Sequence, residues 1–162
     1  MLPAMLAQPA TLAHYLGPAG IDLASVALPL AGALARLGFP SPAEDFLDDT
    51  VDLNQLLIRN APATFLYRAE GWSMLLSGIC DGDILVVDRS VRCEDGDLVI
   101  AIWEGNQPTC KVLKVFEHHL ELHSANPDHA PIVLEPGTEV EVFAVVGVAR
   151  QTRRRKGRVR PR

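Results

Sequence analysis

The stretch "DILVVDRSVRCEDGDLVIAIWEGNQPTCKVLKVF" (83–116) decides the fold class. It holds three short runs rich in β-branched residues, separated by Asp, Gly, Asn and Pro, which are typical turn residues. Similar runs stand before it at 64–70 and after it at 119–123, 131–134 and 139–150. Short strands spaced this closely predict a compact antiparallel β-barrel or sandwich rather than an alternating β-α-β sheet.

Residues 1–37 are rich in Ala and Leu, and prolines recur through residue 40, at positions 3, 9, 18, 29 and 40. This spacing excludes a long helix and favours a flexible arm with short helical turns. A linker (38–60) follows, in which "GFPSPAEDF" (38–46) is rich in Pro and "DLNQLLI" (52–58) predicts one or two helical turns capped by Asp52. The β domain is expected at 61–149 and a basic tail at 150–162.

Charge divides the chain into two parts. Residues 1–149 carry seven basic side chains and all 20 acidic ones, a net charge of −13, whereas the last 13 residues carry eight basic side chains and no acidic one. The body should repel DNA phosphates, while the tail could contact DNA or an acidic protein surface. The alternative is a solvated tail with no partner.

The three cysteines show no CxxC spacing, which fits a reduced chain better than a disulfide or zinc framework. The longest apolar stretch, 20–37, is interrupted by charges and a proline, and the N-terminus lacks the basic start of a secretory signal. We therefore expect a cytoplasmic protein with no membrane segment, no metal and no cofactor.

Ser73 is the candidate nucleophile, because it follows a predicted strand and Gly71, where the chain can turn sharply and present a hydroxyl. Most serines after a glycine are turn residues, so a catalytic role requires a base. Four of the five histidines lie in "EHHLELHSANPDH" (117–129). A Ser/His/Asp triad or a metal site could be built from them, although HHxxxH is not a recognised ligand spacing.

A lysine is the other candidate base. Lys111 and Lys114 share one predicted strand and face opposite sides of it, but parity does not say which side faces the core. Full burial can lower a lysine pKa from ~10.4 by ~3–5 units, which leaves a neutral amine able to take a serine proton. The alternative is two surface lysines on an edge strand.

Taken together, these positions resemble the UmuD branch of the LexA-like self-cleaving serine peptidases over roughly residues 26–149. The resemblance is carried by "GFPSPAEDF", "DLNQLLI", the pair Ser73–Met74, "GICDGDILVVDRS", "GDLVIAI", "CKVLKV", "NP" (126–127) and "VFAVVGVA" (142–149). It implies that Ser73 is the nucleophile, that Lys111 is its base, and that the backbone N–H groups of Trp72 and Ser73 form the oxyanion hole. It also implies self-cleavage between Leu37 and Gly38.

The same resemblance implies an SOS-response protein that loses its arm and then serves as the accessory subunit of an error-prone translesion DNA polymerase. The implied partners are a second copy in a homodimer, a RecA–single-stranded DNA filament that stimulates cleavage, and the catalytic subunit of a Y-family polymerase. The first 37 residues are too short and too proline-rich for the helix-turn-helix domain of a LexA-like repressor.

Two alternatives stay open. A cleavage-dead binding module of the same fold is favoured by Leu37 and Trp72, which stand where the family prefers a small and an acidic residue. A signal-peptidase-like enzyme would share the Ser-Met pair but would normally need a membrane anchor.

Overall fold

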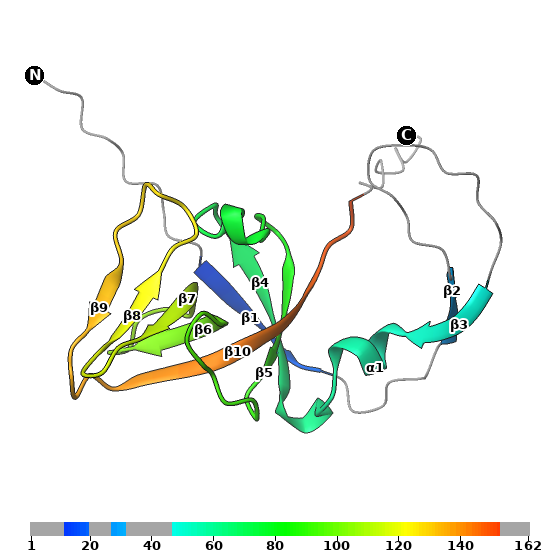
Figure 1. Cartoon of the computed structure of the whole chain (residues 1–162), viewed down its shortest axis with the longest axis horizontal. Coiled ribbons are helices and arrows are strands. Elements are labelled where there is room, and N and C mark those ends of the chain that lie inside the picture. Colours follow the sequence, from blue (N-terminus) through cyan, green and yellow to red (C-terminus); the bar gives the residue numbers. More distant parts are fainter. Residues whose placement is uncertain (1–11, 20–26, 32–46, 153–162) are drawn as a thin grey trace, which may run out of the picture.

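The computed structural model describes residues 12–19, 27–31 and 47–152, and this part of the chain is mostly β, as predicted (Figure 1). Its strands are β1 (Leu12–Pro18), β2 (Ala27–Ala31), β3 (Leu47–Asp52), β4 (Thr64–Glu70), β5 (Ile84–Asp88), β6 (Leu98–Trp103), β7 (Thr109–Val115), β8 (Leu120–His123), β9 (Ile132–Leu134) and β10 (Val140–Ala149). Between them lie the helix α1 (Leu53–Leu57) and two 3₁₀ turns, η1 (Ala61–Ala63) and η2 (Leu75–Ser77).

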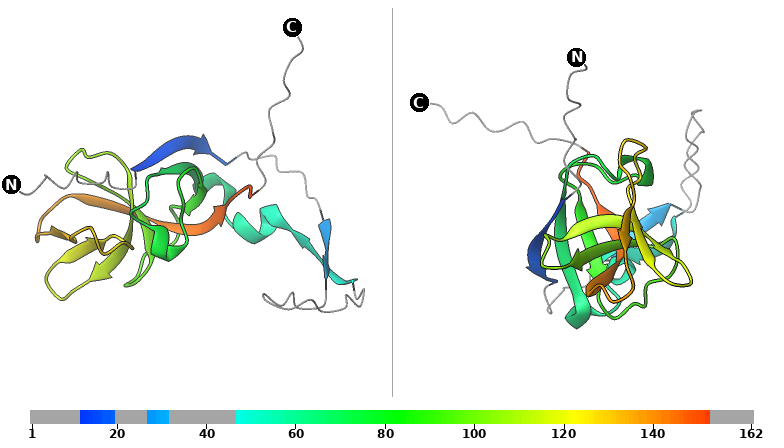
Figure 2. Two further views of the ribbon diagram at one scale, coloured as in Figure 1. Left: turned by 90° about the horizontal axis from the view of Figure 1, so that it is seen from above. Right: turned by 90° about the vertical axis from the view of Figure 1, so that its left-hand side faces the viewer.

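Six strands form a closed antiparallel barrel in the order β1-β4-β5-β10-β6-β7. The barrel closes because β1 pairs with β4 along its length and meets β7 at its start, where Leu12 lies opposite Thr109. The strands β8 and β9 extend the sheet beyond β7. The predicted antiparallel barrel is therefore confirmed, and Figure 2 shows β1 (blue) lying along the barrel next to β4.

The interior is filled from two sides. One buried cluster packs against the closing strand and comprises Ala13, Tyr67, Ala69, Met74, Ile79, Leu85, Val87, Ile100 and Cys110. A second cluster lies under β8 and β9 and comprises Val99, Ala101, Leu113, Leu122 and Leu134. Since burial of a Leu or Ile side chain contributes roughly 1.5–3 kcal/mol, these clusters stabilise the barrel chiefly by removing apolar surface from water.

The short helix α1 begins as predicted, because the carboxylate of Asp52 accepts a hydrogen bond from Asn54 N at 2.8 Å. Its last residue, Leu57, rests on β10. A Cβ atom at Gly147 would stand only 2.8 Å from Leu57 Cδ2, so the glycine is what allows this close approach. The helix thereby links the preceding β2–β3 pair to the barrel.

The described parts of the predicted arm are strands, so the expected helical turns are wrong there. Residues 12–18 pair with β4, and residues 27–31 pair with β3. Pro18 ends β1, where its missing N–H costs no ladder bond, and Gly17 adopts a φ of 127° beside a β-bulge. Both the Leu37–Gly38 bond and the whole "GFPSPAEDF" linker segment (38–46) lie outside the described residues.

Arg150, which the sequence assigned to the basic tail, is tied to the domain. Its guanidinium contacts the buried carboxylate of Asp83 through Nε at 2.6 Å and Nη2 at 2.5 Å, and Nη2 also donates to the carbonyl oxygen of Gly78. The other basic residues of the tail, from 153 onward, lie outside the described part. Within the described residues, no helix is long and apolar enough to cross a membrane.

Candidate active site

Ser73 lies in a tight turn that leaves the end of β4. Gly71 makes the turn with a φ of 92°, and its N–H donates to Asp81 Oδ1 at 2.9 Å. Met74, the residue after Ser73, is fully buried in the core cluster, and its packing there anchors the turn. Ser73 itself is 0% exposed, so its hydroxyl points into the protein. A surface serine needs none of these supports.

Lys111 reaches Ser73 from the middle of β7. Its side chain is 2% exposed, and Nζ lies 3.2 Å from Ser73 Oγ and 2.9 Å from Ser124 Oγ. Burial lowers the pKa of Lys111 from its ordinary value because the ammonium is desolvated. Burial also raises the pKa of Cys110 to about 12, so that thiol stays neutral. The lysine is therefore biased toward the neutral amine that a base must be.

Lys114 takes the other side of the strand. It is partly exposed and pairs with Asp95 Oδ2 at 3.5 Å. Parity alone left the inward lysine undecided. The closed barrel resolves it, since β7 turns Lys111 toward Ser73 and Lys114 toward solvent.

Ser124 is a site residue that sequence reasoning missed. It comes directly after β8, and its hydroxyl makes the shorter of the two contacts to Lys111 Nζ. The loop that it begins is fastened to the nucleophile turn, because Ala125 N contacts Met74 Sδ at 3.4 Å and Ala125 O accepts from Leu76 N at 3.0 Å. No local sequence signal distinguishes this serine.

Residues 29–147 match the model of a protein family described as Peptidase S24-like. The chain belongs to this family. It is 37% identical over 129 residues to Protein ImpA of Salmonella typhimurium, a match that spans 80% of this S24-like chain and 86% of ImpA. It is 38% identical over 118 residues to Protein SamA of Salmonella typhimurium, with 73% and 81% of the two chains covered.

A LexA repressor of a Polaromonas species is 36% identical over 132 residues, and this match spans 81% of the S24-like chain but 55% of the repressor. The chain thus matches ImpA and SamA over most of their length and the repressor over about half of its length. The resemblance to UmuD-like members of the LexA family is confirmed.

In this S24-like chain Trp72 is the residue of the turn just before Ser73, and it is partly exposed to solvent. Its indole is 52% exposed, and its carbonyl oxygen accepts a hydrogen bond from Asn126 Nδ2 at 3.5 Å. This bond is a second link between the nucleophile turn and the loop after β8. The oxyanion role of the Trp72 and Ser73 N–H groups remains a prediction.

Two histidines of the stretch 117–129 share an acidic partner. His119 and His123 both contact the Glu121 carboxylate, at 3.1 and 2.6 Å, and these contacts hold the pKa of Glu121 below its ordinary value. Within the described ranges no group of three His, Cys, Asp or Glu side chains could hold a metal ion. The polar stretch 117–129 reaches the site through Ser124, whose hydroxyl contacts Lys111 Nζ.

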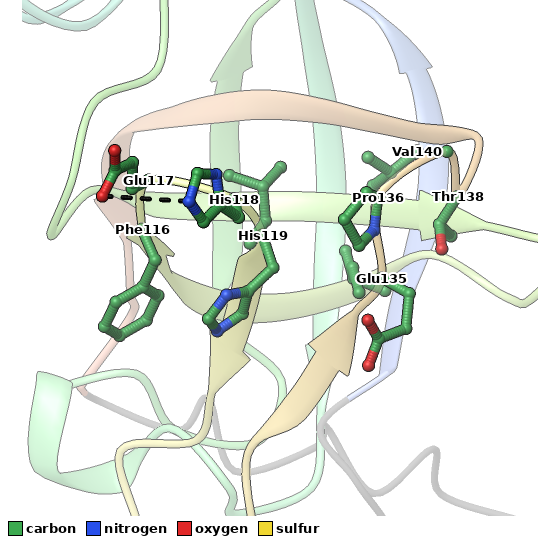
Figure 3. A pocket seen from close by; sticks show the side chains of 11 residues that line it. Phe116, Glu117, His118, His119, Glu135, Pro136, Thr138 and Val140 are labelled. Carbon is green, nitrogen blue, oxygen red and sulfur yellow. Dashed lines mark ion pairs between the residues drawn. The ribbon is translucent and has the colours of Figure 1, made fainter.

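A shallow pocket between the β7–β8 and β9–β10 turns is separate from this site. Phe116 stacks on His119 at one side, with ring centroids 4.7 Å apart, and Glu135 and Thr138 lie at the other (Figure 3). None of its lining residues belongs to the Ser73–Lys111 site.

Proposed function

We propose that this S24-like peptidase cuts its own chain between Leu37 and Gly38, with Ser73 as nucleophile and Lys111 as general base. The observation that carries the proposal is the 3.2 Å approach of a buried lysine amine to a buried serine hydroxyl. Such a pair is the Ser–Lys variant of the nucleophile-plus-base arrangement.

The reaction proceeds in two halves. Neutral Lys111 takes the Ser73 proton while Oγ attacks the Leu37 carbonyl carbon, and the ammonium then gives this proton to the leaving Gly38 amine. This leaves an ester between Ser73 and Leu37. Lys111 next takes a proton from water, which attacks the ester, and Ser73 is regenerated. The N–H groups of Trp72 and Ser73 are assigned to the oxygen that becomes negative in each half.

Ser124 orients the base in this scheme. A lysine side chain has four rotatable bonds, and the hydroxyl 2.9 Å from Nζ restricts where the amine can point. The hydroxyls of Ser73 and Ser124 can accept hydrogen bonds from the Lys111 ammonium and donate to its neutral amine. They can therefore hold Nζ in the same place in both protonation states.

The scissile bond lies in the segment 32–46, between the paired strands β2 and β3. Leu37 lies six residues after the end of β2, so the scissile bond can reach at most about 20 Å from that strand, at ~3.3–3.6 Å per residue. Cleavage within one chain and cleavage across a homodimer are the two routes that we propose, and each requires Ser73 to come within this reach. Gly38 suits a crowded site, because it carries no Cβ to collide with the nucleophile.

We infer that the cut protein acts in the SOS response as the accessory subunit of a Y-family translesion DNA polymerase in the cytoplasm. The support is the UmuD-like resemblance together with identities of 37% and 38% to ImpA and SamA over most of each chain. A homodimer and a RecA–single-stranded DNA filament are the further partners that we propose on the same ground.

The test is the intact mass of the purified protein after incubation with RecA filament, or after incubation at raised pH. The expected product begins at Gly38 and is absent from the Ser73→Ala variant. A full-length chain that is stable under both conditions would instead support the cleavage-dead binding module.

A further inference from the structure

The barrel is closed by a strand that lies upstream of the proposed cleavage site. Residues 12–18 take the free edge of β4 in an antiparallel register that runs from Leu12 opposite Glu70 to Pro18 opposite Phe65. Backbone hydrogen bonds fasten both ends, from Ala13 N to Pro108 O and from Ala19 N to Thr64 O, each at 2.9 Å. The segment thereby fills the gap between β4 and β7, the strand that carries Lys111.

Side chains add specificity to this backbone ladder. Ala13 is 3% exposed and packs in the same cluster as Met74 and Cys110, the chain neighbours of Ser73 and Lys111. On the same face of the strand the Tyr15 ring, which is 52% exposed, lies against the rings of Phe65 and Tyr67, with centroids 5.9 and 5.5 Å away. A small residue two positions before an aromatic one is therefore what the gap accepts.

We propose that the gap between β4 and β7 is a strand-binding site, and that its ligand after self-cleavage is the severed segment Leu12–Pro18. The proposal rests on the proposed cleavage at Leu37–Gly38 for its biological setting. Cutting that bond breaks the covalent link between β1 and the domain but touches none of the contacts of β1. Cleavage and loss of the arm are then two separate steps.

Departure of β1 would expose the edge of β4 and part of the core to solvent. The outer edge of β4 would present unpaired N–H and C=O groups, which are a template for another extended chain. The core face formed by Ala69 and Cys110 would lose the Ala13 side chain that packs beside it. While the severed arm stays bound, β1 keeps the barrel of the cleaved protein closed. Once the arm has left, the edge of β4 can bind another extended peptide.

The experiment uses the full-length chain carrying Ser73→Ala, so that self-cleavage plays no part in it. A recognition sequence for a site-specific protease is inserted after Gly20, upstream of the β2–β3 pair, so that only β1 can hold the freed peptide. After cutting, size-exclusion chromatography and intact mass show whether the peptide elutes with the domain. We expect it to remain bound.

Two glutamate substitutions give a matched pair. Ala13→Glu places a carboxylate in the core cluster, whereas Leu16→Glu places it at a half-exposed position. Burial of an unpaired charge should weaken binding at least about a hundredfold, and the exposed one should leave it within about threefold. The same comparison can be made without preparing a variant of the whole protein. Labelled synthetic peptides of residues 11–20, carrying either change, are allowed to replace the freed peptide in the cut Ser73→Ala protein.

Alkylation of Cys110, mapped by mass spectrometry, provides the second readout. The thiol should react only after the peptide has been displaced, and added unmodified peptide should protect it again. The proposal is overturned if the freed peptide separates at once, or if Ala13→Glu and Leu16→Glu peptides bind equally. It is also overturned if a second copy of the domain, rather than the peptide, fills the gap.

Discussion

Lys111 Nζ lies 3.2 Å from Ser73 Oγ, although the two residues are 38 positions apart in the chain. Ser73 is held at the exit of β4 and Lys111 in the middle of β7, and β1 contacts both of these strands. The dyad therefore depends on barrel closure rather than on any local motif. This dependence determines which substitutions should stop cleavage and which should not.

The two lysines of β7 should behave differently. Lys111→Ala removes the base and should slow self-cleavage by at least about a hundredfold, as loss of a general base usually does. Lys114→Ala removes only a surface contact to Asp95 and should leave the rate unchanged. Intact-mass time courses measure both. If Lys114→Ala stopped cleavage and Lys111→Ala did not, Lys114 would be the base instead.

Ser73→Ala should abolish cleavage, and the double variant with Lys111→Ala should be no slower than either single variant. Members of a nucleophile–base pair act as a unit, so their effects do not add. The measurement is the same time course, with circular dichroism to show that each variant is folded. Additive losses would indicate that the two residues act independently.

The cleavage rate should rise with pH, with a midpoint below 10.5, the ordinary pKa of lysine. Burial lowers the pKa of Lys111, and a base is active only when it is neutral, so a lowered pKa moves the rise in rate to lower pH. Below that midpoint the rate should change about tenfold per pH unit, in proportion to the neutral fraction. A rate that falls as pH rises, or that shows no rise anywhere between pH 5 and 10, would contradict a lysine base.

Ser124→Ala should slow cleavage by about fivefold without abolishing it, since one hydrogen bond of about 1 kcal/mol to Lys111 Nζ is lost. Ser124→Thr keeps the hydroxyl and should restore most of the rate. A structural role alone would lower stability and leave the pH profile of the remaining activity unchanged. A shifted midpoint in the pH profile would identify Ser124 as a positioning residue.

Asp83→Ala should destabilise the domain by about 1–2 kcal/mol, less than the loss of a fully buried ion pair, because solvent screens the half-exposed Arg150 guanidinium. The hydrogen bond from Arg150 holds the pKa of Asp83 below its ordinary value of 3.8. The stabilisation is therefore present above pH 3.8 and is lost as pH falls through the lower, folded pKa. Urea unfolding across this pH range, with exposed Glu139→Ala as control, measures it.

Deletion of residues 153–162 tests the basic tail and spares Arg150, which belongs to the domain. If the tail contacts DNA, its removal should weaken binding to single-stranded DNA and flatten the dependence of binding on salt, because fewer counterions are released. Self-cleavage at raised pH should not change. Equal binding by both proteins across a salt titration would show a solvated tail with no partner.

The barrel strands from β4 to β10 were predictable because each is a short β-rich run bounded by turn residues. The arm was not, because β1 exists through pairing with β4, whose first strand residue lies 46 positions after the end of β1, and its own composition favours short helical turns. Composition also placed Arg150 in the tail, whereas its partner Asp83 lies 67 positions upstream. Long-range pairing outweighs local preference in all of these cases.

The site divides in the same way. The sequence offered Ser73 as a candidate by its turn and left histidines and two lysines as candidate bases, among which the family resemblance favoured Lys111. The closed barrel places Lys111 Nζ beside Ser73 Oγ. Ser124 could not be found, because a serine after a short strand carries no signal until the lysine beside it is known.

A ribosome delivers the arm, the scissile bond and Ser73 before it delivers Lys111 and Ser124. Under the proposed mechanism a nascent chain therefore carries a nucleophile without a base until β7 has emerged and paired with β6 and β8. Such a chain would have to complete its barrel before it could cut itself. The order of synthesis would thus keep each chain's own site inactive until that chain has folded.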